Sequence, residues 1–507
     1  MALVLGIDAG TTSIKVVLFD DAGRALSSAT EEYRLNTPFP DRVELDPRLY
    51  WTALQSAVRR TLSICSVSPS DIHALAISSQ GETLIALDSA GQPLRNAIVW
   101  LDNRSGQEAA DIEAHFGRDT VYMTTGSPEV VPTWAATKIL WLKRHEADIF
   151  KKARRFLLLE DYLIYRLTGE LIGDFALYTS SLLVDIVNYK PWDEMLSFIG
   201  ISSDQLPPIV GSGYIVGPLT CDAAEELGLS ERTLVVTAGM DQACGAVGSG
   251  NIAPGVVTET TGGSLNLLAT IDEHSIDSAR AVPIQCHILP DTYIALPWCQ
   301  TAGMVLKWFR DGFCAHEVDE AIRTGGDAYD LLSDLAGTIN PGCDGLIMLP
   351  HLAGAMCPEF DMNARGVFFG IDLSHGRAHF VRAIMESIAY MLRRNIESIR
   401  EMGIDITEVR AMGGAANSAI WTGIKADVLH VPVVTMRSKE AACLGAAIVA
   451  GAATGVFGSI EDACNNIVRL NNRYMPKPEN KDAYDSGYER YVRLYECLAN
   501  LFPRHDA

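Results

Sequence analysis

Hydrophobic and polar positions switch repeatedly between the period of a strand and the period of a helix along this chain. Short apolar runs bounded by glycine or polar residues predict strands, and longer segments with apolar residues three or four apart predict helices. The clearest helix covers residues 379–402, and Gly403 follows it as a C-terminal cap. The predicted strands cover residues 74–78, 84–87, 234–238, 256–260, 346–349, 409–412 and 431–435, and the other predicted helices cover 47–62, 134–145 and 483–501. Strands mixed with helices throughout are typical of an α/β protein.

The length of the chain predicts two large domains. It has 507 residues, and hydrophobic cores stop growing near about 250–300 residues. The best boundary lies near residues 245–255, where glycine and Pro254 interrupt the pattern. We therefore predict an N-terminal domain of residues 1–247 and a C-terminal domain of residues 248–507.

Residues 4–23 predict two strands joined by a turn of small and polar residues. Consecutive backbone N–H groups in such a turn form an anion-binding concavity, hydroxyl groups add donors, and glycine lets a ligand approach. A carboxylate beside them is the hard oxygen ligand that a phosphate-bound Mg²⁺ needs. An ordinary hairpin turn is the alternative. The side chains concerned are Asp8, Gly10, Thr11, Thr12 and Ser13.

The same theme recurs after the predicted boundary. Residues 256–260 lead into a second small turn, and residues 265–269 lead out of it. This weak duplication predicts two similar domains, each with one phosphate-gripping hairpin, although chance recurrence is the alternative. The second turn consists of Thr261, Gly262, Gly263 and Ser264.

Asp241 follows a predicted buried strand and precedes a tightly packed helix. Ligands of open α/β sheets bind at the carboxyl ends of strands, so Asp241 is placed as a carboxylate at the site. It is a candidate helix cap or a candidate general base. A division of labour with Asp8 is then available, in which one carboxylate holds a metal and the other accepts a proton.

Three further segments carry candidate polar side chains. Gly413 and Gly414 follow another strand and let a flat ligand approach, while Asn417 suits a base or a helix cap. Two other segments follow apolar runs and carry amide, carboxylate and indole side chains. These side chains suit the hydroxyl groups and the apolar face of a sugar. Taken alone, these last two segments favour ordinary surface loops with one buried tryptophan. Their side chains are Gln80, Gly81, Glu82, Trp100, Asp102 and Arg104.

Composition narrows the function. The formal net charge of −22 argues against a nucleic-acid binder, which would carry a basic patch. Eleven cysteines without metal-type spacing, and no secretory signal, predict reduced thiols in the cytoplasm. No run of about 18 apolar residues is present, so no membrane span is expected.

Together these segments resemble the FGGY carbohydrate kinases of the actin-like ATPase superfamily, over nearly the whole chain and in the right order. The most specific stretch is residues 366–386, GVFFGIDLSHGRAHFVRAIME, which fits the C-terminal signature of the family and has an architectural role. Residues 137–142 and 161–170 resemble two further blocks. The resemblance implies an α/β fold of two actin-like (ribonuclease H-like) domains that face each other across a nucleotide and sugar cleft.

The resemblance also implies roles for individual residues. Asp241 matches the catalytic base, and Asp8 would hold Mg²⁺. Many relatives have Gly-Thr-Ser-Gly at the second turn, and this chain departs from that pattern. The residues expected to bind ATP are Gly10, Thr11, Thr12, Ser13, Thr261, Gly262, Gly263, Ser264, Gly303, Gly413, Gly414 and Asn417.

The resemblance implies that the phosphoryl acceptor is a sugar or a polyol, but its motifs divide over which one. Gln80 and Glu82 fit glycerol kinases, but Gly81 replaces their arginine, and Gln242 also fits that group. Trp100, Asp102 and Arg104 fit the pattern common in pentulose kinases. We expect ATP-dependent phosphorylation of a primary hydroxyl, with a pentulose such as xylulose as the leading acceptor.

The alternatives are a glycerol- or erythritol-type polyol kinase, a non-catalytic sugar or nucleotide sensor on the same fold, and a chaperone-like ATPase. The last would need a peptide-binding domain, and the chain after Gly458 holds only a short helical tail. The expected partners are a small-molecule sugar or polyol and ATP, without nucleic acid or membrane, and formation of a homodimer is left open.

Overall fold

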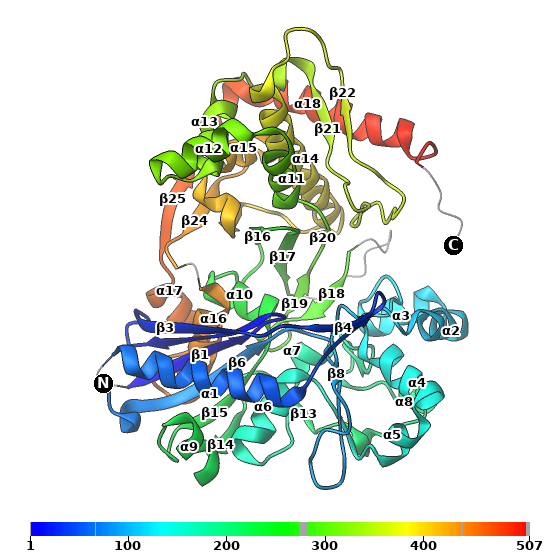
Figure 1. The fold of residues 1–507 in the computed structure, drawn as a ribbon, viewed down its shortest axis with the longest axis vertical. Coiled ribbons are helices and arrows are strands. Elements are labelled where there is room, and N and C mark those ends of the chain that lie inside the picture. The colour runs from blue at the N-terminus through cyan, green and yellow to red at the C-terminus, as the bar shows by residue number, and fades with distance from the viewer. Residues whose placement is uncertain (1, 66, 273–281, 439, 503–507) are drawn as a thin grey trace.

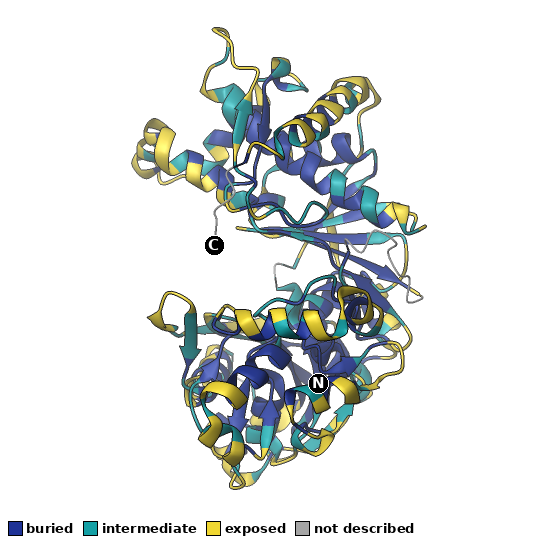
Figure 2. Cartoon of the chain, turned by 90° about the vertical axis from the view of Figure 1, so that its right-hand side faces the viewer, coloured by how far each residue is buried: buried dark blue, intermediate teal, exposed yellow. Residues whose placement is uncertain are grey.

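A computed structural model describes residues 2–65, 67–272, 282–438 and 440–502. Figure 1 shows two α/β units, one above the other, with the first half of the chain in the lower unit. In Figure 2 the strands are largely buried and the outer helices carry the exposed positions. This confirms the predicted α/β class with two domains.

The lower unit is built on a six-stranded sheet with the order β14-β15-β6-β1-β2-β3. Its central strand β1 pairs antiparallel with β2 and parallel with β6, and β6 pairs parallel with β15. The apolar side chains of β1 are buried on both faces, as expected of a central strand. The bounds are β1 (Leu3–Ala9), β2 (Ser13–Phe19), β3 (Ala25–Glu32), β6 (Ile72–Ser79), β14 (Ile215–Pro218) and β15 (Leu234–Met240).

The upper unit repeats this plan. Its sheet has the order β18-β19-β17-β16-β23-β24-β25, and β20 also pairs with β17. The central strand β16 pairs antiparallel with β17 and parallel with β23, as β1 does with β2 and β6. The predicted similarity of the two halves is therefore confirmed at the level of topology. The bounds are β16 (Val256–Thr261), β17 (Leu265–Ile271), β18 (Ile284–Cys286), β19 (Tyr293–Ala295), β20 (Trp298–Cys299), β23 (Glu408–Met412), β24 (Val433–Met436) and β25 (Leu470–Tyr474).

Two helices join the units. α10 (Asp241–Gly248) follows β15 of the first sheet, and α16 (Ala441–Ala453) follows β24 of the second. They pack against one another, and α16 also packs on β1 and β6, so the second half of the chain contributes a helix to the first sheet. Both helices lie between the two sheets in Figure 1.

Each predicted strand and helix is present, with ends that differ by at most three residues. The predicted helix at residues 379–402 is α14 (Arg377–Glu401), and Gly403 follows its cap in a left-handed conformation. The other helices are α1 (Pro47–Ile64), α2 (Gly106–Phe116), α3 (Arg118–Thr125), α4 (Ala135–His145), α5 (Ala147–Lys152), α6 (Leu159–Thr168), α7 (Phe175–Tyr178), α8 (Asp193–Ile199), α9 (Cys221–Leu227), α11 (Gly303–Phe313), α12 (Ala315–Thr324), α13 (Ala328–Gly337), α15 (Ala419–Leu429), α17 (Ile460–Ile467) and α18 (Lys481–Leu498).

Among the helices of the described residues, none is long and apolar enough to cross a membrane.

Short elements complete the fold. The remaining strands are β4 (Asn36–Phe39), β5 (Arg42–Leu45), β7 (Ile85–Leu87), β8 (Ala97–Ile98), β9 (Arg155–Leu157), β10 (Gly173–Asp174), β11 (Val184–Asp185), β12 (Lys190–Pro191), β13 (Ile209–Val210), β21 (Ile347–Leu349) and β22 (Val367–Phe369), and the 3₁₀ turns are η1 (Pro69–Asp71), η2 (Ser203–Gln205), η3 (Cys343–Gly345), η4 (Gly414–Asn417) and η5 (Pro478–Asn480).

Candidate active site

The first small turn joins β1 to β2 and is held by backbone contacts. The Gly10 N–H donates to the carbonyl of Ser13 at 3.0 Å, and the Tyr33 N–H donates to the carbonyl of Thr12 at 2.9 Å. The Tyr33 hydroxyl donates to the Gly10 carbonyl. Gly10 does not have a positive φ, so glycine is not needed there for backbone conformation. Close approach of a ligand is its remaining use.

Asp8 lies near the end of β1, directly across the ladder from Lys15 on β2. Burial raises the pKa of the Asp8 carboxyl to about 6, and the nearby Lys15 ammonium opposes this shift. The Lys15 Nζ lies 2.7 Å from Oε2 of Glu440, immediately before α16. The sequence interpretation missed Lys15, although its alternation with Ser13 along one strand offered a signal.

Asp241 is the first residue of α10, immediately beyond the end of β15. Its Oδ1 accepts a hydrogen bond from the Gln242 N–H at 2.7 Å. Burial, followed by the charges of Asp8 and Glu82, raises the pKa of Asp241 to about 8. The structure therefore brings three carboxyl groups from three segments into one electrostatic environment. A carboxylate with such a pKa is a good proton acceptor near neutral pH.

The second small turn meets two other glycine loops. The Gly303 N–H donates to the Gly262 carbonyl and the Ala302 N–H to the Gly263 carbonyl, both at 2.8 Å. Gly413 is left-handed with φ 77°, and a Cβ on it would lie 2.8 Å from the Thr261 carbonyl oxygen. Three segments far apart in the sequence thus lie close together, and their binding of a nucleotide stays a prediction.

The residues that follow Gly413 are partly accessible to solvent. Gly414 and Asn417 are exposed in η4. The cap of α15 is Ser418, whose Oγ accepts from the Trp421 N–H at 3.1 Å, so the expectation that Asn417 caps the helix is wrong. Its side chain is left for another role.

A buried charged network stabilises the start of the second turn. Lys425 Nζ donates to Glu259 Oε1 at 2.6 Å and to the Thr261 hydroxyl at 2.8 Å. The Thr261 hydroxyl donates in turn to Glu259 Oε2 at 2.7 Å. The side chain of Thr261 is therefore engaged inside the protein, and only its backbone faces the turn. Neither Glu259 nor Lys425 stood out in the sequence.

The first turn also contacts one of the segments proposed for sugar binding. The indole N–H of Trp100 donates to the Thr11 hydroxyl at 2.8 Å, and the Trp100 backbone N–H donates to Thr83 Oγ1 at 3.3 Å. Gln80, Glu82, Asp102 and Arg104 are buried and Trp100 is partly exposed. The interpretation of these segments as surface loops is therefore wrong.

Asp102 and Arg104 largely satisfy each other. The Asp102 carboxylate accepts from Arg104 Nε at 2.8 Å and Nη2 at 2.7 Å, and from the Val43 N–H at 2.6 Å. Arg104 Nη2 also lies 2.6 Å from Glu44 Oε1. Arg104 Nη1 is buried and has no hydrogen-bond partner in the part of the chain that the structure describes. Asp102 thus serves the local structure, and Arg104 keeps one donor.

Glu82 occupies an unusual position in the other segment. It has φ 58°, and Lys138 Nζ donates to its carbonyl at 3.0 Å and to that of Thr133 at 2.7 Å. Burial raises the pKa of the Glu82 carboxyl to about 7, opposed by Lys138. Gln80 donates to the Tyr50 hydroxyl at 3.3 Å, while its Oε1 is buried and has no hydrogen-bond partner among the described residues. Since buried polar atoms are nearly always hydrogen-bonded, this oxygen is available to a water molecule or a ligand.

The donor set favours Mg²⁺ brought in by a nucleotide over a resident metal. Among the described residues, no group of three or more His, Cys, Asp or Glu side chains is placed to hold a metal ion. Asp8 offers a hard carboxylate near the end of β1, beside the first turn, and Mg²⁺ typically takes one or two carboxylates plus phosphate oxygens. The residues present therefore fit this mode of binding.

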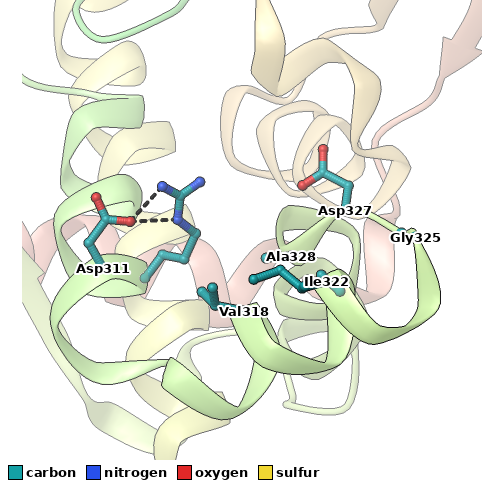
Figure 3. A pocket seen from close by; sticks show the side chains of 9 residues that line it. Asp311, Val318, Ile322, Gly325, Asp327 and Ala328 are labelled. Carbon is teal, nitrogen blue, oxygen red and sulfur yellow. Dashed lines mark hydrogen bonds and ion pairs between the residues drawn. The ribbon is translucent and has the colours of Figure 1, made fainter.

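A surface pocket between α11, α12 and α13 lies outside this constellation (Figure 3). Its guanidinium, from Arg310, is paired with Asp311 at 2.7 and 2.5 Å and lies 4.6 Å from the ring centre of Tyr329. The pocket shares no lining residue with either small turn or with the loops of Asp241, Glu82 and Trp100.

Comparisons with known proteins identify the family of this chain. Residues 3–248 match the N-terminal domain of the FGGY family of carbohydrate kinases, and residues 260–454 match its C-terminal domain. A xylulose kinase from Bacillus subtilis is 31% identical over 99% of this chain and 98% of its own. A gluconokinase from Bacillus subtilis is 30% identical over 98% of this chain and 96% of its own. The crystal structure of a ligand-bound xylulose kinase from Lactobacillus acidophilus has a TM-score of 0.91 and 25% identity, with 99% of both chains covered.

The matches to both family domains and to a relative of 31% identity over nearly the whole chain show that this protein is an ATP-dependent carbohydrate kinase. The chain belongs to the FGGY family of carbohydrate kinases. The family resemblance seen in the sequence is thereby confirmed.

Proposed function

We propose that this kinase transfers the γ-phosphate of ATP to a primary hydroxyl of a pentulose such as xylulose. The observation that carries the proposal is Asp241, a proton acceptor at the end of β15 in the same electrostatic environment as Asp8. The Trp100–Thr11 hydrogen bond supports it further, because it places the proposed sugar segment against the first phosphate turn.

In this mechanism Asp241 accepts the proton of the sugar hydroxyl while the hydroxyl oxygen attacks the γ-phosphorus and the bond to the β-γ bridging oxygen breaks. ADP leaves, and the proton remains on Asp241. Asp8 would hold Mg²⁺, which when bound neutralises charge on the phosphate oxygens. Backbone N–H groups of the two turns, with the Thr11, Thr12 and Ser13 hydroxyls, would stabilise the transferring group.

The C-terminal half would hold the nucleotide. Gly303 and Gly413 approach the second turn, Gly414 and Asn417 follow in η4, and the exposed Gly413 and Gly414 leave room for a flat base. We accordingly assign sugar and phosphate binding to residues 1–247 and nucleotide binding to residues 248–507. We also propose a cytoplasmic location, because none of the eleven cysteines forms a disulfide.

Glu82 bears on the class of acceptor. Its carboxyl is buried among the proposed sugar segments, and Lys138, the cation that opposes its raised pKa, already donates to two carbonyls. The ionised fraction of Glu82 would repel a substrate carboxylate, and the Arg104 guanidinium is already paired with Asp102 and Glu44, so a neutral pentulose is favoured over an aldonate such as gluconate. The second candidate acceptor is a polyol of the glycerol or erythritol type, because Gln80, Glu82 and Gln242 fit glycerol kinases.

The test is sugar-dependent ADP release in a panel of xylulose, ribulose, glycerol, erythritol and gluconate. We expect the highest kcat/KM with a ketopentose. A preference for gluconate would overturn the argument from Glu82. No turnover with any member, together with retained ATP binding, would favour a sensor.

A matched variant tests the base. Asp241→Asn preserves shape and removes the proton acceptor, so we expect kcat to fall about 10²–10⁴-fold while ATP affinity is kept. Near-normal turnover would reject the role of Asp241.

A further inference from the structure

The strand that carries Asp241 ends in a one-residue bulge. Thr237 of β15 pairs with Ile77 of β6, but the next pair joins Met240 to Ser79. β15 therefore advances three residues while β6 advances two, and Ala238 and Gly239 lie in the bulge. Gly239 is left-handed, with φ 80°. A bulge of this kind redirects the chain that follows it.

Glu160, in the first turn of α6, supplies the hydrogen bonds at the bulge. Its Oε1 accepts from the Ala238 N–H at 2.8 Å and from the Gly239 N–H at 3.1 Å. Glu160 is fully buried, and it reaches the bulge from 78 residues earlier in the chain. One side chain oxygen thus serves two consecutive amides.

Asp174 closes the bulge from another direction. A Cβ on Gly239 would lie 2.8 Å from Asp174 Oδ1 and 3.1 Å from the Ala176 Cβ, so this position has no room for a side chain. Asp174 Oδ1 is itself fixed by Ser212 and by the Ala176 N–H, both at 2.8 Å. The bulge is therefore packed between two carboxyl groups from separate segments.

A buried carboxyl group at this place needs an explanation. Burying one is costly, and burial together with the nearby Asp174 raises the pKa of Glu160 well above its ordinary value. Without the bulge, the backbone amides of β15 could donate to a neighbouring strand and would not need the Glu160 carboxyl. However, a shift of one residue in a strand turns every following side chain to the opposite face. The bulge thus sets the direction in which the chain leaves β15 for Asp241.

We propose that Glu160 is a positioning residue for phosphoryl transfer, which holds the bulge of β15 and thereby directs Asp241 toward the acceptor hydroxyl. The inference rests on the proposed role of Asp241 as the base. It requires an acceptor oxygen at residue 160, not a charge, because both hydrogen bonds are donated by backbone amides.

Three variants separate this role from simple stability. Glu160→Gln keeps the acceptor, and we expect kcat within about threefold of wild type. Glu160→Leu removes it, and we expect kcat to fall about 10²-fold, the usual cost of a small misplacement of a catalytic group, with KM for sugar and ATP little changed. Asp161→Asn is the control, because Asp161 is equally buried but bonds to Tyr178 and the Leu158 N–H, away from β15.

Gly239→Ala provides a second route should Glu160→Leu fail to fold. The added Cβ disturbs the bulge without touching Glu160, so kcat should again fall while KM stays. Full kcat in folded Glu160→Leu or in Gly239→Ala would overturn the proposal. Equal losses in Glu160→Gln and Glu160→Leu would also overturn it, because the acceptor would then not matter.

Hydrogen exchange makes the test independent of turnover. We expect the amides of Ala238 and Gly239 to exchange at least tenfold faster in Glu160→Leu than in wild type or Asp161→Asn. Unchanged exchange rates would refute the proposal that Glu160 holds the bulge of β15. If the wild-type chain phosphorylates no sugar, the proposed function fails, whereas the exchange experiment still decides whether Glu160 holds the bulge.

Discussion

Removal of the Lys425 ammonium should destabilise the C-terminal half and weaken its nucleotide site together. Lys425 and Glu259 expose 1% and 0% of their side chains, and their ion pair is 2.6 Å long. In Lys425→Met, the Glu259 carboxylate keeps only the Thr261 hydroxyl as a partner. Breaking one side of a buried pair costs about 3–5 kcal/mol, because the other charge remains buried and uncompensated.

For a unit of about 250 residues, each kcal/mol corresponds to roughly 2–4 °C, so Tm should fall by about 6–20 °C. Thr261 also loses the ammonium that orients its hydroxyl, so KM for ATP should rise more than KM for the sugar. Thermal unfolding followed by fluorescence, and initial rates at varied ATP, measure the two effects.

Two further variants make this prediction specific. Lys307→Met removes an exposed ammonium whose pair with Asp311 leaves 59% and 44% of the side chains accessible, so it should cost less than about 1 kcal/mol. Lys425→Met combined with Glu259→Gln removes both charges and should recover most of the lost stability. A Tm of Lys425→Met within 1–2 °C of wild type, on the order expected for a surface pair, would refute the reasoning.

Three other outcomes follow from the site. Since the pKa of Asp241 is raised to about 8, kcat/KM should increase with pH up to about 8, and a pH–rate profile that is flat between pH 6 and about 8 would contradict a base with this raised pKa. The folded state binds this proton more tightly than the unfolded state, so its stabilising effect is lost as pH rises through the folded pKa; Asp241→Asn should therefore gain Tm relative to wild type between about pH 4 and 8. Trp100→Phe deletes the hydrogen bond to Thr11, worth about 0.5–1.5 kcal/mol, and should lower kcat/KM for the sugar about 2–12-fold, whereas an unchanged value would show that the contact does not orient the turn.

The sequence predicted the elements whose information is local. A strand, a turn of small residues and a second strand occupy about twenty consecutive positions. The hairpin at Gly10 and the hairpin at Gly262 could therefore both be predicted, one in each half of the chain. Asp241 was visible for the same reason, since it follows directly on a buried strand. The convergence of Gly303 and Gly413 on the second turn came from the family resemblance, because nothing local links these positions.

The residues that the sequence did not reveal act across long separations. Lys425 and Glu259 are 166 residues apart, Lys15 and Glu440 are 425 apart, and Glu160 reaches β15 over 78 residues. Each of these side chains looks like that of an ordinary surface residue in its own segment. Glu259, Lys425 and Glu160 are distinguished by their burial, whereas Lys15 and Glu440 stay about one third exposed and are distinguished by their ion pair. Burial and such long-range pairing both depend on the whole fold. The prediction that the segments of Glu82 and Trp100 are surface loops was wrong for the same reason. The sequence of a loop does not show which other elements pack over it.

The interface between α10 and α16 shows how the two halves of the site are connected. A Cβ on Gly445 would overlap the Cys244 carbonyl, one on Gly248 the Ala441 carbonyl, and one on Gly6 the Cys443 carbonyl. These contacts are between backbones, so no change of rotamer relieves them, and alanine at any one must separate the elements. Asp241 begins α10, and Glu440, the partner of Lys15, precedes α16. The spacing of this helix pair therefore sets the relation between the proposed base and the charges beside the first phosphate turn.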